Sequence, residues 1–374
     1  MSVSIKFTKV VMGENKELKI KETISFLRLP LMVAIIFIHS VLTSVNIGGV
    51  TLVNVGEFPI YDGVNWVLSQ EIFRVAMRLF FFFSGFLFFY KSDFSTSIYL
   101  GKLKRRVKTL LIPYIFWNLF SLMFYWGAQV FMGSMTSGTN KLIADYSFVD
   151  WLNVFWDFNY GMPVNLPLWF IRDLMIMAIL SPVLYVLIKY VKLAFVLVLG
   201  VLWCCDLWQG VLSVSAVGLF FFSLGAWFSI NKVNFVEVFS GWKKWALGLY
   251  VMLLVASVAL KYGNVMDVYV VVHNLEIMAG LVAVVGWTNY GVERKKLKCN
   301  HLLAESSFFI YVYHGLPMLF VTKMWVKTFY PASELSMITG YILIPTVIVL
   351  LGIGMYYLMQ RYLPRFTKIV MGSR

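Results

Sequence analysis

The fold class is decided by two apolar stretches, FLRLPLMVAIIFIHSV at residues 26–41 and ITGYILIPTVIVLLGIGMYYLM at residues 338–359. A hydrocarbon core of roughly 30 Å is crossed by about 20 helical residues, each of which rises 1.5 Å. Both stretches are almost continuously apolar, whereas the strands of a membrane β-barrel alternate apolar and polar residues. The sequence therefore predicts helices that span a membrane.

The composition of the whole chain agrees with this prediction. Of the 374 residues, 60% are hydrophobic and only 13% are charged, and the mean hydropathy is +0.79. A soluble protein usually carries about a quarter charged residues, and a chain this apolar could not keep its surface wetted in water. We therefore predict an all-α, polytopic membrane protein.

About ten membrane-spanning helices are predicted, with both termini on the cytoplasmic side. Basic residues concentrate in the cytoplasmic segments of membrane proteins, and most of the 32 Lys and Arg residues fall in alternate connections of a ten-span arrangement. The net charge of +14 is therefore interpreted as a topology signal, and no nucleic-acid partner is expected. The predicted spans are approximately 24–45, 72–90, 110–132, 167–189, 192–208, 211–229, 243–260, 268–288, 305–325 and 337–360.

These spans divide the chain into a cytoplasmic N-terminal segment (1–23), a transmembrane domain (24–362) and a cytoplasmic tail (363–374). The first segment is polar and basic, and no small-residue cleavage site follows it, so the first helix is expected to be retained.

Three connections have a marked composition. The outer connections 46–71 and 133–166 carry acids and aromatics, which fit either an interfacial belt or a lid over an outer opening. The inner segment 94–108 has a basic cluster beside apolar residues, so it is expected to lie on anionic lipid or to bind an anionic ligand.

Ionisable residues within spans are the main candidates for a functional site, because each is costly in hydrocarbon unless it faces a cavity or a partner. Arg28 is expected at the cytoplasmic entrance, and His39 lies about 16 Å further along the same helix. His314 is expected at a comparable depth, roughly 14 Å from the inner start of the ninth span. His39 also fits a packing role. His314, with Gly315 and Pro317, also fits a helix break at which the histidine bonds a freed carbonyl.

Other polar groups in the spans have simpler structural interpretations beside their functional ones. Ser84 and Gly85 permit close helix approach. Asp173 could neutralise Arg78 or Arg172, as a structural pair.

His273 and Glu276 lie three apart near the outer start of the eighth span, but a metal or acid/base role is only weakly indicated there. Phosphate-binding and hydrolase motifs and spaced Cys/His clusters are absent from the sequence. No metal site is predicted.

Five segments carry a resemblance to a known family. They are Arg28 followed by His39 eleven positions later, FFFFSGFLF at 80–88, KRRVKTLLIPYIFWN at 104–118, LPLWFIRDL at 166–174 and SFFIYVYHG at 307–315. Their order resembles acyltransferase family 3, whose members are integral membrane O-acyltransferases that modify carbohydrates and related acceptors. The resemblance spans nearly the whole chain and looks closest to the short, ten-span members without a fused soluble domain.

The resemblance implies that acyl-CoA, usually acetyl-CoA, is a co-substrate that approaches from the cytoplasm, and that no cofactor is permanently bound. The acceptor would be a carbohydrate or glycolipid, and the location the bacterial inner membrane, among its lipids. The residue that matches His39 is the proposed catalytic base or acyl relay, and the one that matches Arg28 helps to hold the donor. Nothing in the sequence indicates an oligomeric state.

The resemblance also places the basic run before the PY motif at the phosphates of CoA. The residues implied in acyl-CoA binding here are Arg105, Arg106, Lys108, Tyr114 and Trp117. Many members carry an Arg-x-x-Arg element at this point, which this chain lacks. Lys108 can neutralise a phosphate as a point charge but cannot grip it with a planar fork.

The chemistry of these residue types agrees with such a reaction. An alcohol is a poor nucleophile at neutral pH, so acylation benefits from a neutral imidazole base, for which His39 is the candidate. The tetrahedral oxyanion needs hydrogen-bond donors. Its candidate donors and their support are Ser84, Arg78, Arg172 with Asp173, and His314.

We therefore predict a membrane-embedded O-acyltransferase. The enzymatic interpretation requires that the ring of His39 faces the protein interior and that a passage links it to the basic inner mouth. The alternative is a proton-coupled transporter or flippase that uses Arg28, His39 and His314, and an acyltransferase that has become an inactive scaffold is a third interpretation.

Overall fold

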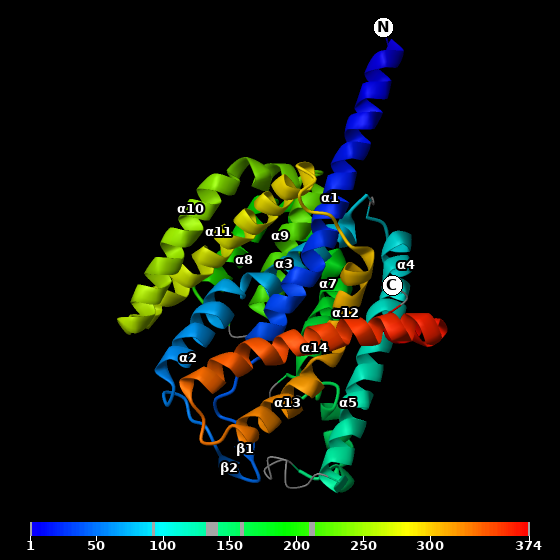
Figure 1. Cartoon of the computed structure of the whole chain (residues 1–374). Coiled ribbons are helices and arrows are strands. Elements are labelled where there is room, and N and C mark those ends of the chain that lie inside the picture. The colour runs from blue at the N-terminus through cyan, green and yellow to red at the C-terminus, as the bar shows by residue number, and fades with distance from the viewer. Residues whose placement is uncertain (1, 92–93, 132–140, 158–160, 209–213, 373–374) are drawn as a thin grey trace.

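The protein folds as an all-helical bundle, as predicted (Figure 1). The computed structural model describes residues 2–91, 94–131, 141–157, 161–208 and 214–372, with side chains from residue 16 onward. Within these residues, strand structure is limited to an antiparallel ribbon of β1 (Asn46–Ile47) and β2 (Val50–Thr51). The predicted span ends at 132 and 211–213 lie outside the described residues, as do the last two residues of the predicted tail.

The helices follow one another along the chain, and the segment between α1 and α2 contains the strand ribbon. They are α1 (Ser2–Ile38), α2 (Pro59–Asn65), α3 (Val75–Phe89), α4 (Thr96–Arg106), α5 (Ile112–Phe131), α6 (Phe148–Asn153), α7 (Trp169–Tyr190), α8 (Leu193–Cys204), α9 (Ala216–Ile230), α10 (Phe235–Tyr262), α11 (Met266–Glu293), α12 (His301–Tyr313), α13 (Gly315–Thr328), α14 (Glu334–Tyr362) and α15 (Pro364–Val370). The π-helical segments η1 (Trp66–Ile72) and η2 (Val107–Leu111) join α2 to α3 and α4 to α5. The 3-10 turns η4 (Ile143–Asp145) and η5 (Leu166–Leu168) precede α6 and α7.

Six helical stretches in the described residues are long and apolar enough to cross a membrane. They are Pro59–Phe89, Thr96–Phe131, Leu166–Tyr190, Phe235–Tyr262, Met266–Glu293 and Glu334–Tyr362. Each of the ten predicted spans contains helix, but α8 and α9 have only 12 and 15 residues. At 1.5 Å per residue they are shorter than a hydrocarbon core of roughly 30 Å. The count of ten crossings therefore stays a prediction.

Several predicted boundaries were wrong. The first span was expected to reach residue 45, but α1 ends at Ile38. The expected connection 46–71 contains α2 and η1, because Pro59 at the first helical position favours an earlier helix start. The segment 94–108 is α4, which is capped by Ser95 and continues through η2 into α5. The predicted ninth span is divided at His314 into α12 and α13.

The central helix of the bundle is α1. It packs against α3, α11, α12 and α14, so residues at its end lie among several other helices. Along one edge of the bundle, α10 and α11 form an extensive antiparallel pair (Figure 1). The core position of α1 matters because its end carries His39.

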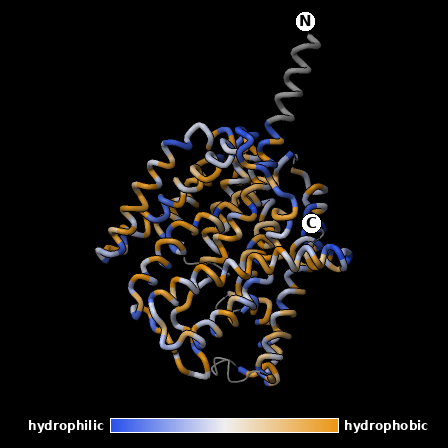
Figure 2. Tube along the Cα trace, in the orientation of Figure 1, coloured by the Kyte–Doolittle hydropathy of each residue, from blue (hydrophilic) through white to orange (hydrophobic). Residues whose placement is uncertain are grey.

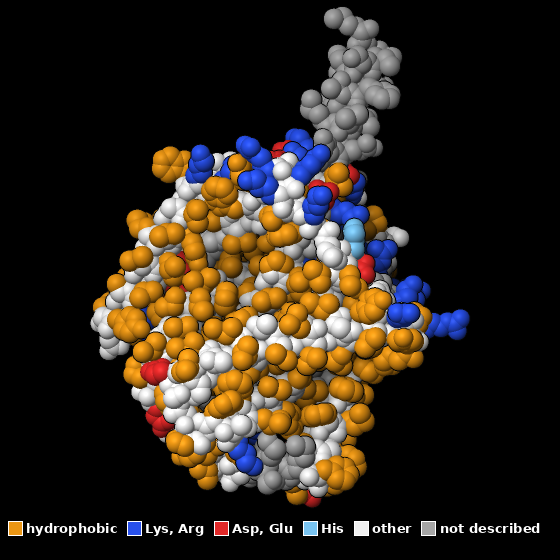
Figure 3. All heavy atoms as spheres, viewed as in Figure 1, with side chains coloured by type: hydrophobic (Ala, Val, Ile, Leu, Met, Phe, Trp, Pro, Cys, Tyr) orange, Lys and Arg blue, Asp and Glu red, His pale blue; other side chains and the backbone are white. Residues whose placement is uncertain are grey.

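The surface of the bundle is that of a membrane protein. Figure 2 shows hydrophobic residues along most of the helices, and Figure 3 shows apolar side chains over much of the visible face, with many Lys and Arg at the end from which α1 projects. Large apolar side chains are exposed on α10 and α14, for example Trp245 and Leu350. Lipid is the solvent in which so large an apolar surface is stable.

Two glycines let α3 and α9 touch backbone to backbone. A Cβ on Gly85 would lie 2.0 Å from the carbonyl oxygen of Phe222, and one on Gly225 would lie 2.0 Å from that of Phe82. Small residues are the usual means by which helices approach closely in lipid, where no hydrophobic force drives them together. The predicted close approach at Gly85 is confirmed.

This contact gives a stability prediction. Gly85→Ala should destabilise the protein by at least about 2 kcal/mol, because the new methyl group can be accommodated only if the two helices separate. The measurement is the thermal unfolding midpoint of the purified protein in detergent. The control is Gly248→Ala on α10, where a Cβ would meet nothing within 4 Å. That substitution should be neutral or slightly stabilising; equal midpoints for the two variants would contradict the packing argument.

Candidate functional site

Two histidines from distant parts of the chain meet inside the bundle. The rings of His39 and His314 have centroids 5.4 Å apart and are inclined at 44°. His314 is fully buried and His39 is half-buried. The ring of His39 therefore faces the interior of the protein, which is the first of the two conditions that the enzymatic interpretation requires.

The end of α1 positions His39. The helix loses its regular hydrogen bonding after Ile38, where the N–H of Ser40 bonds the carbonyl of Phe37 at 3.1 Å, and side chains of other elements donate to the carbonyls around this end. Ser69 donates to the carbonyl of Phe37 at 3.0 Å, and Asn65 donates to that of Ser40 at 3.1 Å. Ser69 in turn is 2.9 Å from the hydroxyl of Tyr341 on α14. Side chains of α2, η1 and α14 thus hold the backbone on both sides of His39.

A helix break positions His314. Pro317 has no backbone N–H, so the hydrogen-bond ladder between α12 and α13 is incomplete. The Nδ1 atom of His314 lies 2.7 Å from the carbonyl oxygen of Tyr311, and Asn165 donates to that of Val312 at 3.0 Å. The structural interpretation of His314, that it bonds a freed carbonyl, is therefore confirmed, although the same ring also faces His39.

The hydrogen bond of His314 fixes its tautomer. A carbonyl oxygen only accepts, so Nδ1 must carry the proton and Nε2 of a neutral ring is an acceptor. The Nε2 atom has no hydrogen-bond partner among the described residues. A buried acceptor without a donor is costly, so Nε2 is available to a group that enters the site.

Two buried asparagines support this region, and sequence reasoning missed both. Asn118 accepts a hydrogen bond from the backbone N–H of Asn165 at 3.1 Å and donates to the carbonyl of Tyr114 at 2.8 Å. Tyr311 donates to the carbonyl of Pro167, and Gly315 leaves room for the same proline ring. The sequence held one indication of their role: Asn118 ends the motif 104–118, and Asn165 directly precedes the motif 166–174. An amide in an apolar environment needs hydrogen-bond partners.

Arg172 and Asp173 form a buried ion pair, the structural pairing that was expected as a default. Arg172 donates to Asp173 at 2.7 and 3.1 Å, and Ser215 donates to the other carboxylate oxygen at 2.6 Å. Ser215 also caps α9, and the guanidinium lies 5.2 Å from the ring centroid of Trp156. This network connects α7 to α9, and the role of these residues at an oxyanion stays a prediction.

Arg78 and Ser84 lie on α3 and are half-buried. Arg78 donates to the carbonyl of Arg74 at 3.1 Å, and its Nε atom has no hydrogen-bond partner among the described residues. Arg74 is close enough to His39 for its charge to act on the imidazole. Arg74, the N-cap residue of α3, therefore supplies positive charge near His39.

A pocket of about 440 Å³ lies at the basic end of the bundle. It is lined by Glu17, Leu18, Ile20, Lys21, Ile24, Ser25, Arg28, Leu87, Tyr90 and Lys91. Arg28 is exposed there, as an entrance residue should be. Lys21 and Lys91 also lie there, although sequence reasoning did not assign them to the site, and Lys91 is paired with Glu17 of the same pocket at 2.5 Å.

The pocket does not extend to His39, which is absent from its lining. Eleven residues make about three helical turns, so Arg28 and His39 share one face of α1. Between them on that face lie Met32 and Ile35, which are buried. The second condition, a passage from the basic mouth to the imidazole, is therefore not met by this pocket.

The other predicted donor-binding residues lie outside the Arg28 pocket. Arg105 and Lys108 are exposed. The Cζ atom of Arg106 lies 5.6 Å from the ring centroid of Phe88. Tyr114 and Trp117 are buried, and their polar atoms donate to the carbonyls of Phe155 and Val370. These two contacts connect α5 to the segment between α6 and α7 and to α15. That Tyr114 or Trp117 binds CoA stays a prediction.

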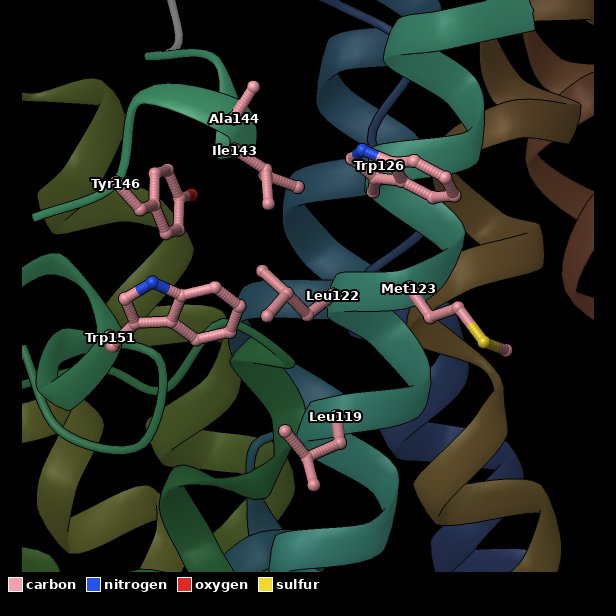
Figure 4. Close-up of a pocket in the computed structure, with 8 residues that line it drawn as sticks. All are labelled: Leu119, Leu122, Met123, Trp126, Ile143, Ala144, Tyr146 and Trp151. Atoms are coloured by element: carbon pink, nitrogen blue, oxygen red, sulfur yellow. The ribbon is translucent and has the colours of Figure 1, made fainter.

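A second pocket, of about 500 Å³, lies between α5 and the segment around η4 and α6 (Figure 4). Figure 4 shows Leu122 and Trp151 on opposite sides of it. None of the predicted site residues lines this pocket. Beside it, Lys141 donates to Asp150 at 2.6 Å, and this hydrogen bond, together with those from the backbone and side chain of Ser147, lowers the pKa of that carboxyl to about 2.

Comparisons with known proteins agree with the sequence resemblance. Residues 22–358, which include Arg28 and both histidines, match a family model described as an acyltransferase domain. The chain is 25% identical over 337 residues to the succinoglycan biosynthesis protein ExoH of Rhizobium meliloti (strain 1021), which covers 85% of this chain and 84% of that protein. No solved structure matches the chain.

The asparagine contacts give a second stability prediction. Asn165→Ala should destabilise the protein by about 1–3 kcal/mol, because it leaves the buried carbonyl of Val312 without a donor. Thermal unfolding in detergent is the measurement. Asn231→Ala is the matched control, since that exposed amide also donates to a backbone carbonyl but is surrounded by solvent or headgroups. Its effect should stay within about 0.5 kcal/mol, and a loss as large as that of Asn165→Ala would refute the assignment.

Proposed function

The chain belongs to acyltransferase family 3, and from this premise we propose that it transfers an acetyl group from acetyl-CoA to a hydroxyl of a polysaccharide or glycolipid. The similarity to a succinoglycan biosynthesis protein supports a polysaccharide as the acceptor. The gathering of Lys and Arg at the end from which α1 projects supports cytoplasmic termini and donor entry from that side (Figure 3). The proposed location is the bacterial inner membrane.

The observation that carries the proposal is the pair of imidazoles inside the bundle, above a cationic pocket on the same helix. A lone histidine in a span can be a packing residue, but His39 faces His314 at 5.4 Å between ring centroids. Arg28 and Lys21 line a pocket that suits an anionic donor, and the third cation there, Lys91, is paired with Glu17. A base with a charged entrance is what thioester-dependent acylation of an alcohol requires.

The proposed reaction uses neutral His39 as the base. It removes the proton of the acceptor hydroxyl while the oxygen attacks the thioester carbonyl, and a tetrahedral oxyanion forms. Collapse of this intermediate forms the ester and breaks the carbon–sulfur bond, and the CoA thiolate takes the proton from the imidazolium. No net proton is consumed or released.

The hydrogen bonds of His314 favour one of its proposed roles. With Nδ1–H bonded to Tyr311, Nε2 can accept but not donate, so this tautomer does not suit the stabilisation of an oxyanion. It does suit acceptance of a hydrogen bond from an N–H of His39 or from the acceptor hydroxyl. His314 is then a positioning residue, and the oxyanion needs positive charge or hydrogen-bond donors from other residues, among which Arg78 stays a candidate.

The donor must reach His39 from the Arg28 pocket. The two residues are about 16 Å apart along α1, and the buried side chains of Met32 and Ile35 lie on the face between them. An extended acyl arm of CoA would follow this face only if those side chains yield. Binding of the donor is therefore expected to require local rearrangement around α1.

The first activity prediction concerns the base. His39→Ala should lower kcat for acetyl transfer by at least about 100-fold, because the hydroxyl loses its general base. Transfer of labelled acetyl, together with release of the CoA thiol, is measured with purified protein in detergent. His301→Ala is the control, since that histidine is exposed at the start of α12, and it should keep full activity.

Full transfer by a folded His39→Ala protein would refute the role of His39. A native protein that neither binds acetyl-CoA nor releases its thiol would instead favour the transporter or flippase. The two results are distinguishable: in the first the protein is still an acyltransferase that uses another base, and in the second the native protein does not catalyse the reaction.

The second activity prediction concerns the donor pocket. Arg28→Gln should raise the KM for acetyl-CoA more than it lowers kcat, because a phosphate contact contributes to binding in both ground and transition states. The KM of the native protein should also rise with ionic strength, since salt screens exposed charges. Steady-state kinetics at low and high salt measures both effects.

Arg361→Gln is the control for this substitution, because Arg361 is exposed at the end of α14 and lies outside the pocket lining. It should leave the KM unchanged. A native KM that does not depend on salt would argue against phosphate contacts at this mouth.

A further inference from the structure

A second buried cluster of ionisable residues lies outside the histidine pair. Glu71 comes from η1, while His273 and Glu276 come from α11, one helical turn apart. Glu71 and Glu276 are buried with exposures of 1% and 0%. One ligand atom from each of the three residues lies within 4.8 Å of the other two.

The hydrogen bonds within this cluster go to Glu71 and not to Glu276. Glu71 accepts from the hydroxyl of Tyr269 at 2.7 Å and is 2.7 Å from Nδ1 of His273. Glu276 has neither carboxylate oxygen in a hydrogen bond to any described residue. The nearest charged partner of Glu276 is the same Nδ1 atom, at 3.6 Å, which exceeds hydrogen-bond distance.

Glu276 is the carboxylate that lacks a hydrogen-bonded partner, because His273 bonds Glu71 and the charge of Arg74 also acts on Glu71. Two buried carboxylates so close together repel each other, and one imidazole already bonded to Glu71 cannot satisfy both. Either a cation sits between the carboxylates or a proton is shared by them. A cation satisfies both oxygens of Glu276 without any further side chain, and the cluster combines oxygen and imidazole ligands that divalent transition metals accept.

We propose that Glu71, His273 and Glu276 bind one divalent transition-metal ion, of the Zn²⁺ or Mn²⁺ type. Metal–ligand bonds to such ions are about 2.0–2.2 Å long, so the side chains would move to surround one centre. Nδ1 of His273, which donates to Glu71 at 2.7 Å, would release its proton to solvent when it binds the ion. The two carboxylates balance the charge of the ion. Sequence analysis identified only His273 and Glu276. It missed the third ligand, Glu71, because Glu71 lies in η1, within the expected connection 46–71.

The metal would brace the support of His39. It would join η1 to α11, and η1 also carries Ser69, whose hydroxyl holds the carbonyl of Phe37 two residues before His39. The proposed ion is structural. It would act on the imidazole pair only indirectly, through η1 and the hydrogen bond from Ser69 to the carbonyl of Phe37. It does not depend on the acyltransferase reaction.

The test uses the full chain in detergent, with any histidine-containing tag removed, treated with a chelator and then dialysed. Zn²⁺ or Mn²⁺ is added back, and bound metal is measured by elemental mass spectrometry together with the thermal unfolding midpoint. We expect one ion per chain and a higher midpoint with metal. Glu276→Gln should weaken binding at least about tenfold and remove the midpoint shift. Asp267→Asn, on the same helix but exposed, should behave as native.

A second measurement avoids dependence on one variant. Co²⁺ added to the native protein should produce visible absorption bands that are lost in His273→Gln and in Glu71→Gln. Native protein that binds neither ion and whose midpoint does not change would overturn the proposal and assign a shared proton to the two glutamates. Equal metal binding by native protein and Glu276→Gln would overturn it too, since the ion would then bind elsewhere.

Discussion

Backbone carbonyls that lose their helical partners in lipid must find other donors, and this constraint shapes the centre of the protein. Two helices are interrupted there: α1 ends at Ile38, and α12 gives way to α13 at His314. Asn65 and Asn165 donate to the carbonyls of Ser40 and Val312 beside these interruptions, and Ser69 adds a second donor to the carbonyl of Phe37, which the N–H of Ser40 also bonds. A carbonyl left without any donor would cost several kcal/mol in hydrocarbon. The same interruptions bring the two imidazoles face to face.

Charge inside the bundle follows a related logic. Arg172, Asp173 and Ser215 form a network in which the carboxylate accepts from both partners, so an expensive pair becomes a link between α7 and α9. Glu276 and the Nε atom of Arg78 differ, because neither has a hydrogen-bond partner among the described residues. Polar groups that a protein leaves unsatisfied at such cost are candidates for contact with a ligand, an ion or a substrate.

The sequence singled out the two histidines that the structure brings together, and its omissions have a common cause. His39 and His314 could be placed at similar depth because both lie on recognisable apolar helices, where position along the chain converts to height. Asn118, Asn165 and Glu71 were missed because their partners are far away in sequence. A pairwise contact such as Glu71 with His273 depends on how α11 packs against η1, which no local pattern contains.

Composition and hydropathy by themselves determined that this is a helical membrane protein, because the thickness and polarity of a bilayer restrict the length and composition of any segment that crosses it. The order of its motifs along the chain carried the resemblance to acyltransferase family 3, to which the chain belongs. Only the tertiary structure decided where helices stop and which residues meet. The ends of α1 and α12 depend on side chains from other helices that replace lost backbone hydrogen bonds, and the contact of α3 with α9 depends on two glycines that lie opposite each other only after folding. Segments become helical for local reasons, but polar groups in lipid are satisfied by whichever partner the fold brings near.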